Sequence, residues 1–319
     1  MNPGPESAAP RYSAAPNSDP APARVPARVV ILGLGAVGLR LGLAWLNAGL
    51  PVVGFSRGPG PRERARSAGL PVTESLHTAL ALLPGGGETW LVLCVPDAEL
   101  ERAAESAARC LGSLAGAPRP VALHTAGCRG VQALESLAKQ GCSTGTLHPL
   151  AAFSPAGPGP DLTRAWCAIS GDGRARQAAR RLVFALGART LELRDQGSAQ
   201  VAYHAAASLL SNGTVALADQ ALELARGACA DPEEARAAFQ SLLEGTVLNL
   251  GSSTPERALT GPVSRGDLAT VQAHLALLSA DPEARELYRL LALRLSALAA
   301  RDGRLSPDSV QALARLLEP

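Results

Sequence analysis

The chain has 319 residues, and 47% of them are hydrophobic, so it is long enough for one large or two modest domains with sizeable cores. Its 30 Lys and Arg residues exceed its 28 Asp and Glu residues by two, and this near balance argues against nucleic acid or anionic lipid as a partner.

The cysteines and the N-terminal residues indicate a cellular compartment. The six cysteines form no CxxC pair and are typical of ordinary thiols in a reducing environment. The first residues lack the basic patch and apolar run of a signal peptide, and glycines and Arg40 interrupt the most apolar early segment. We therefore expect a cytoplasmic protein without a membrane span. Residues 1–26, rich in Pro, Ala and Ser, are predicted to form a disordered tail.

From residue 27 onward, short apolar segments alternate with helical ones. The predicted strands are 29–32, 51–55, 89–95, 120–124, 146–148, 166–170 and 190–193. The predicted helices between them run to about residue 48, over 97–111 and over 175–186. This alternation predicts an α/β domain at 27–195, with a Rossmann-type parallel sheet covered by helices on both faces.

After residue 195 the sequence consists mostly of helix-forming residues. The predicted helices are 200–226, 232–250, 267–278, 282–300 and 306–317. They predict a second, all-helical domain at 196–319. Asp267 is expected to cap the helix that follows it.

The first predicted strand ends in GLGAVG, which sets Gly33, Gly35 and Gly38 in the GxGxxG spacing. In a dinucleotide site, these glycines permit a tight turn, close approach of the backbone to a pyrophosphate, and packing of the helix on the sheet. The free amides at the start of the helix, near Ala36 and Val37, then face the phosphates. The alternative is a glycine-rich turn that binds nothing.

The second predicted strand ends in Ser56 and Arg57, and no Asp or Glu follows until Glu63. NAD sites usually place a carboxylate here to bind the ribose 2′-OH. Ser56 donates a hydrogen bond instead, and Arg57 suits a 2′-phosphate. The pattern predicts NADP as the cofactor, and the alternative for Arg57 is a solvated turn residue.

The third predicted strand ends at Val95 and Pro96, followed by Asp97. In this kind of fold, that strand end lies beneath the nicotinamide half of the cofactor, so Val95 and Pro96 are assigned to cofactor binding. For Asp97, a role as helix N-cap is the alternative.

Four later stretches carry a family resemblance: HTAG at 124–127, LHPLAAF at 147–153, YHAAASLLSN at 203–212 and LTGPVSRGD at 259–267. With the glycine turn, their order resembles bacterial Rossmann-like proteins that have an uncharacterised helical C-terminal domain and are labelled as NADP oxidoreductases. That family is similar to ketopantoate reductase, pyrroline-5-carboxylate reductase, prephenate dehydrogenase and the β-hydroxyacid dehydrogenases. The resemblance implies hydride transfer, a substrate cleft between the domains and a helical domain that supports a homodimer.

One position departs from these relatives. Ketopantoate reductase and the β-hydroxyacid dehydrogenases carry a catalytic Lys four residues before an Asn on the first helix of the second domain. Here Asn212 matches the Asn, but Ser208 stands in place of the Lys. A serine cannot act as an ammonium-type proton donor, so the proton comes from elsewhere or the protein is not that kind of reductase.

Hydride addition to a carbonyl or imine leaves charge on the heteroatom, and His204 is the predicted proton donor. Helical spacing puts Ser208 and Asn212 beside His204 as hydrogen-bond partners. His148 is expected to contact the substrate, as a similar His-Pro stretch suggests in prephenate dehydrogenases. Arg265 is the candidate for gripping a substrate carboxylate. For the two histidines and Arg265, a purely structural role is the alternative.

His124 and His274 are weaker candidates, and no close pair of histidines supports a metal site. Three functions follow from these residues. The first is an NADPH-dependent reductase of a small carboxylated carbonyl compound, such as a ketopantoate-like 2-keto acid. The second is an imine reductase or prephenate-type dehydrogenase on the same frame, and the third is an NADP-binding regulator without turnover.

Overall fold

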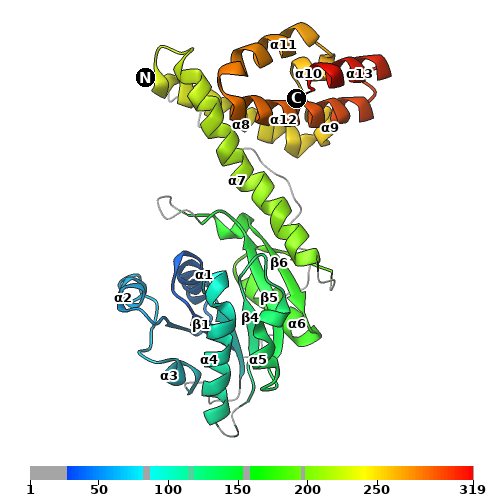
Figure 1. Ribbon diagram of the computed structural model, residues 1–319. Helices are drawn as coiled ribbons and strands as arrows, with labels where there is room; N and C mark the ends of the chain where they lie inside the picture. The colour runs from blue at the N-terminus through cyan, green and yellow to red at the C-terminus, as the bar shows by residue number, and fades with distance from the viewer. Residues whose placement is uncertain are drawn as a thin grey trace, which may run out of the picture. The chain divides into compact units, whose positions relative to one another are not determined.

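The computed structural model describes residues 27–81, 87–114, 116, 118–153, 159–194 and 198–318. The predicted tail at 1–26 lies outside the described residues. The chain divides into two compact units, one within 16–213 and one within 214–319. Figure 1 shows the sheet of the first unit in blue to green.

The first unit contains a seven-stranded sheet in the order β2-β1-β3-β4-β5-β6-β7. Its strands are β1 (Ala27–Leu32), β2 (Val52–Phe55), β3 (Glu88–Leu93), β4 (Val121–His124), β5 (Ser143–Leu150), β6 (Trp166–Gly171) and β7 (Arg189–Glu192). The predicted Rossmann-type sheet is confirmed, with one difference: β5 and β6 are antiparallel, whereas the other neighbours are parallel. The described part of their connection contains a short 3-10 turn, η3 (Leu162–Arg164), and no crossover helix, so the chain reverses direction there.

The central strands are buried on both sides because helices pack on each face of the sheet (Figure 1). Successive strand residues point to opposite faces. Val29 and Ile31 therefore belong to a core shared with α1 and α6, and Val30 and Leu32 to a core shared with α3 and α4. The helical elements of this unit, apart from η3, are α1 (Ala36–Asn47), α2 (Pro59–Ser67), α3 (Leu76–Ala81), η1 (Asp97–Glu99), α4 (Leu100–Ser113), η2 (Val131–Leu134), α5 (Glu135–Ala138) and α6 (Gly173–Ala185).

Helices α2 and α3 have no counterpart in the sequence analysis. Helix α2 consists of PGPRERARS and buries only Ala65, so it lacks the apolar stripe by which an amphipathic helix is found. Helix α3 has six residues, too few for a periodic pattern.

Helix α7 (Ala199–Arg226) appears as predicted. The division between the two units falls inside it, after Gly213, so its first half is grouped with the sheet. Among the described residues, no helix combines the length and apolar character needed to cross a membrane.

The second unit is helical. It contains the second half of α7, then α8 (Pro232–Ser252), α9 (Pro255–Ala258), α10 (Pro262–Arg265), α11 (Leu268–Leu277), η4 (Leu278–Ala280), α12 (Pro282–Arg301) and α13 (Pro307–Leu316). Side-chain caps start four of these helices, and the predicted cap at Asp267 is confirmed: its carboxylate accepts a hydrogen bond from the Thr270 amide at 3.1 Å. A small core that includes Val271, Ala299 and Leu313 holds α10 to α13 together.

Candidate functional site

The glycine turn between β1 and α1 depends on close backbone packing. Gly33 has a φ of +104°, and a Cβ there would lie 2.5 Å from the Cys94 carbonyl oxygen. A Cβ on Gly38 would overlap the Gly33 carbonyl oxygen. At Gly35, by contrast, a Cβ would meet no atom within 4 Å. Gly33 and Gly38 are thus required by the fold, whereas Gly35 faces open space.

That open space lies at the N-terminus of α1. The Leu39 amide donates to the Gly35 carbonyl at 3.0 Å as the helix begins, so the preceding amides, at Ala36 and Val37, have no acceptor within the helix. Gly35 and Ala36 are exposed, and the first turn carries no acidic side chain. Exposed amides and a positive helix end form a site for an anion such as a pyrophosphate.

A cavity of about 460 Å³ opens beside this turn, at the carboxyl ends of β1, β2 and β3, and we call it the dinucleotide cavity. Six of the nine predicted cofactor residues line it: Gly33, Gly35, Ser56, Arg57, Val95 and Pro96. Ala36, Val37 and Gly38 do not line it but form the adjoining first turn of α1. Open α/β sheets bind nucleotides in the crevice outside the carboxyl ends of their strands, which is where this cavity lies.

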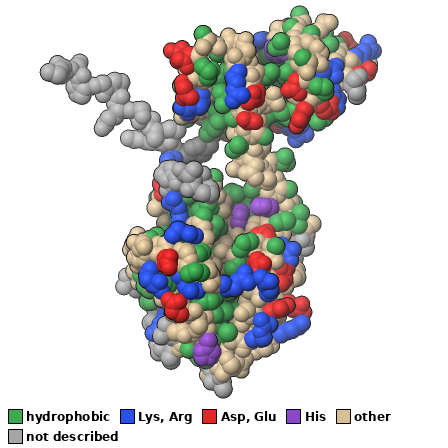
Figure 2. All heavy atoms as spheres, turned by 60° about the vertical axis from the view of Figure 1, so that its left-hand side comes forward, with side chains coloured by type: hydrophobic (Ala, Val, Ile, Leu, Met, Phe, Trp, Pro, Cys, Tyr) green, Lys and Arg blue, Asp and Glu red, His purple; other side chains and the backbone are tan. Residues whose placement is uncertain are grey.

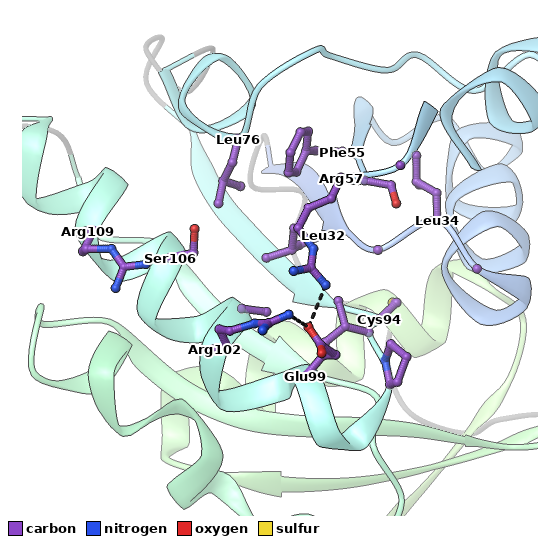
Figure 3. A pocket seen from close by; sticks show the side chains of 17 residues that line it. Leu32, Leu34, Phe55, Arg57, Leu76, Cys94, Glu99, Arg102, Ser106 and Arg109 are labelled. Carbon is purple, nitrogen blue, oxygen red and sulfur yellow. Dashed lines mark hydrogen bonds and ion pairs between the residues drawn. The ribbon is translucent and has the colours of Figure 1, made fainter. Parts of the chain in front are cut away.

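The side chain of Arg57 points into the cavity and meets Glu99 (Figure 3). Arg57 Nη2 donates to Glu99 Oε2 at 2.6 Å, and Arg102 Nη2 donates to the same oxygen. The hydrogen bond from Arg57, with a further one from Arg102, lowers the pKa of Glu99. Arg109 also lines the cavity, so three guanidinium groups and one carboxylate surround it.

The sequence analysis did not identify Glu99, Arg102 or Arg109. Glu99 ends η1, and Arg102 and Arg109 follow on α4 with helical spacing, a signal that was present in the sequence. It also missed Arg62, whose Nη1 donates to the Ser56 and Arg57 carbonyls at 2.7 and 3.0 Å and fixes the turn after β2. The alternative role of Asp97 as a helix N-cap is wrong, because residues 97–99 form the 3-10 turn η1 and no side chain caps η1 or α4.

A second pocket, of about 480 Å³, lies between the end of β5 and the first half of α7, and we call it the histidine pocket. It brings together four of the five predicted catalytic residues: His148, His204, Ser208 and Asn212. Asn212 Nδ2 donates to Ser208 Oγ at 3.3 Å. No Lys, Arg, Asp or Glu is found among the described residues that line this pocket.

Tyr203 and the two histidines form the polar part of the pocket. The Tyr203 hydroxyl and His148 Nδ1 are hydrogen-bonded at 2.9 Å, and the rings of His148 and His204 meet edge to face with centroids 5.7 Å apart. His204 Nδ1 is buried without a hydrogen-bond partner. This nitrogen faces Gly127 and is shielded from the pocket.

Gly127 forms the floor beneath both histidines. A Cβ there would overlap His204 Nδ1 and lie 2.8 Å from His148 Nε2. The buried side chain of Gln200 holds this floor in place, since its Nε2 donates to the Gly127 carbonyl at 3.2 Å. Tyr203 and Gln200 escaped the sequence analysis because their partners lie far away along the chain.

Burial shifts the pKa values of His148 and Tyr203. It lowers the pKa of His148 to about 4, and the neighbouring His204 acts in the same direction. Burial also raises the pKa of Tyr203 to about 12. At neutral pH, His148 is therefore uncharged and Tyr203 keeps its proton.

The remaining candidates, Arg265, His274 and His124, line neither pocket. Arg265 belongs to the helical unit, where it is exposed at the end of α10. His274 is paired with Tyr288 at 2.9 Å in the same unit. His124 is fully buried with Nε2 3.1 Å from the Gly130 carbonyl, and burial lowers its pKa to about 4. Within the described residues, no cluster of three His, Cys, Asp or Glu side chains is arranged to bind a metal.

Family models match most of the chain. Residues 13–149 match a Rossmann-like domain, and residues 165–295 match a domain of unknown function, DUF2520. A comparison with curated proteins finds no match.

Solved structures show the same fold. A protein named as a putative NADP oxidoreductase from Bacteroides fragilis has 20% identity and a TM-score of 0.65, over 85% of this chain and 98% of its own. An imine reductase from Streptomyces aurantiacus has 20% identity and a TM-score of 0.55, and the match covers 90% of this chain and 99% of the reductase. A Plasmodium falciparum pyrroline carboxylate reductase with NADP bound has 11% identity and a TM-score of 0.55, and the match covers 85% of this chain and 98% of that protein. These matches confirm the predicted resemblance and fold class.

Proposed function

The chain joins a Rossmann-like domain to a DUF2520 domain, and on this basis we propose that it is an NADPH-dependent reductase of a carbon–nitrogen or carbon–oxygen double bond. The observation that carries the proposal is the fit of the dinucleotide cavity to NADP. Exposed amides of α1 adjoin it, Gly35 leaves room for a pyrophosphate, and Arg57 and Arg102 supply charge for a 2′-phosphate. The structural neighbours named for NADP and for imine reduction support the same reading.

When bound, NADPH supplies a hydride, and the residues of the chain must supply a proton to the reduced heteroatom. We assign this proton to His204. The low pKa of His148 keeps that residue neutral, and Tyr203 fixes its ring through Nδ1. Two adjacent imidazoles repel each other when both carry a positive charge, and a neutral His148 avoids this repulsion. Asn212 and Ser208 then orient the substrate from the next turns of α7.

The histidine pocket favours an uncharged substrate. Its described lining carries no cation to pair with a carboxylate, whereas Leu150, Leu191 and Leu210 give it apolar walls. This favours an imine or a neutral carbonyl compound. A ketopantoate-like 2-keto acid or a prephenate-type substrate requires a cation, and the described lining of this pocket carries none.

The experiment is NADPH oxidation, followed by absorbance, against cyclic imines, ketone and amine mixtures, and 2-keto acids. Turnover with imines or neutral ketones supports the assignment. Turnover confined to 2-keto acids, and lost in Arg265→Ala, shifts it to a carboxylated substrate. Saturable NADPH binding without turnover on any compound contradicts the enzyme and favours an NADP-binding regulator.

We further propose a cytoplasmic homodimer. Helices α7 and α8 carry exposed leucines at positions 209, 210 and 242, whose exposed fractions are 77%, 73% and 65%. Apolar faces of this kind are commonly covered by a second subunit. Light scattering coupled to gel filtration tests this, and a monomer at every concentration contradicts it. On the face drawn in Figure 2, Lys and Arg are interspersed with Asp and Glu.

A further inference from the structure

Glu99 places a carboxylate at the point where two cationic groups of the dinucleotide cavity meet. A single oxygen, Oε2, accepts hydrogen bonds from both Arg57 and Arg102 (Figure 3). All three residues line the cavity. The side chains of Arg57 and Arg102 are 69% and 62% exposed, so both guanidinium groups retain access to solvent and to a ligand.

The two arginines are arranged to bind an anion. A guanidinium recognises carboxylate and phosphate oxygens by the same planar set of donors. The backbone of Arg57 is held by Arg62, and Arg102 is carried by the first turn of α4. The backbones of Arg57 and Arg102 are thus fixed, while their exposed side chains can reorient. In the absence of a ligand, Glu99 is the acceptor that both guanidinium groups share.

We propose that Glu99 is an internal competitor of the cofactor 2′-phosphate and so determines how strongly the protein prefers NADPH over NADH. This inference rests on the proposed function. A 2′-phosphate that binds Arg57 and Arg102 has to displace the Glu99 carboxylate, which then lies beside a second anion. NADH has no such phosphate, so Glu99 keeps its partners when NADH binds. Glu99 therefore weakens NADPH binding selectively.

The test is calorimetric titration of the full-length protein with NADPH and with NADH. Because Glu99→Gln removes the charge and keeps the shape, we expect it to tighten NADPH binding about 3- to 10-fold and to change NADH binding less than about twofold. Glu105→Gln is the matched control, since it removes the same charge from an exposed position of α4 that does not line the cavity. It should change neither affinity by more than about twofold.

A second comparison separates displacement from simple repulsion. In an Arg57→Ala background, much of the contact that Glu99 blocks is absent, so we expect Glu99→Gln to tighten NADPH binding less than about twofold. Full tightening in that background, equal tightening by Glu105→Gln, or unchanged or weaker NADPH binding by Glu99→Gln overturns the inference. None of these outcomes contradicts the proposal that the protein binds NADP. Failure of the wild-type protein to bind either dinucleotide overturns the proposed function instead.

Discussion

The dinucleotide cavity and the histidine pocket lie on the same unit but use opposite physical means. The cavity gathers exposed guanidinium groups and free helix amides, which keep their charge and partial charge in contact with solvent. The pocket gathers shielded imidazole and phenol groups whose pKa values are shifted by burial. Permanent charge suits an anion such as a dinucleotide phosphate, whereas His148 and Tyr203 are uncharged at neutral pH and suit hydrogen bonding to a substrate. The contrast supports the proposed division into a nucleotide site and a substrate site.

The largest expected effect comes from the glycine turn beside the cavity. Gly38→Ala forces a Cβ onto the Gly33 carbonyl, so we expect a loss of about 3 kcal/mol in the free energy of unfolding together with loss of dinucleotide binding. Gly35→Ala faces open space, and we expect it to lose binding while stability changes by less than about 1 kcal/mol. Urea unfolding and NADPH titration of both variants measure this. Intact binding in Gly35→Ala argues against a pyrophosphate at this turn.

The next effect concerns the pocket. His204→Ala removes the assigned proton donor, and we expect kcat to fall about 100- to 1000-fold while the Kd for NADPH stays within about twofold. Steady-state kinetics and NADPH titration of the variant provide the check. A matched fall in kcat and in NADPH affinity assigns His204 to cofactor binding and removes the distinction between the two regions.

Gly127→Ala tests the packing beneath the two histidine rings without removing a titrating group. The new Cβ displaces the rings of His204 and His148, so we expect kcat to fall about 10- to 100-fold with NADPH affinity unchanged. Gly112→Ala on α4 is the control, because its Cβ would meet nothing closer than 3.7 Å. Normal turnover in Gly127→Ala shows that the spacing of the two rings is irrelevant to catalysis.

The smallest effect is on stability at acidic pH. The pKa of His148 falls from an ordinary value of 6.5 to about 4 on folding, so the unfolded chain binds more protons between these values. Stability from this residue is complete above pH 6.5 and is lost toward pH 4, by on the order of 1–3 kcal/mol. His148→Gln does not titrate and should show a shallower decline in urea unfolding between pH 7 and 4.5. The buried His124 causes a similar loss of stability toward acidic pH in the wild-type protein and in His148→Gln, so the comparison isolates His148. Equal declines contradict the burial of His148.

Local motifs explain why the cofactor half of the site was predictable. Gly33, Gly35 and Gly38 act through the backbone within six residues, so their spacing alone specifies the turn. Arg57 follows a strand that is recognisable by its apolar run. The partner of Arg57 is 42 residues away on another element, and the sequence gives no pairing rule that connects them.

Side-chain sites built from distant segments were only partly predictable. Helical spacing correctly grouped His204, Ser208 and Asn212 on one face of α7. The contacts of Tyr203 with His148 and of Gln200 with Gly127 span 55 and 73 residues and depend on how β5 and α7 pack. The antiparallel β6 was missed for the same reason, because strand direction is decided by the connection and not by the strand sequence.

The most direct measurement of the central claim is calorimetric titration of the purified wild-type protein and of Arg57→Ala with NADPH and NADH. We expect saturable NADPH binding by the wild-type protein, and an Arg57→Ala Kd that is about 10- to 100-fold higher for NADPH but within about twofold for NADH. No binding of either dinucleotide by folded wild-type protein, or an equal loss for both in Arg57→Ala, would contradict it.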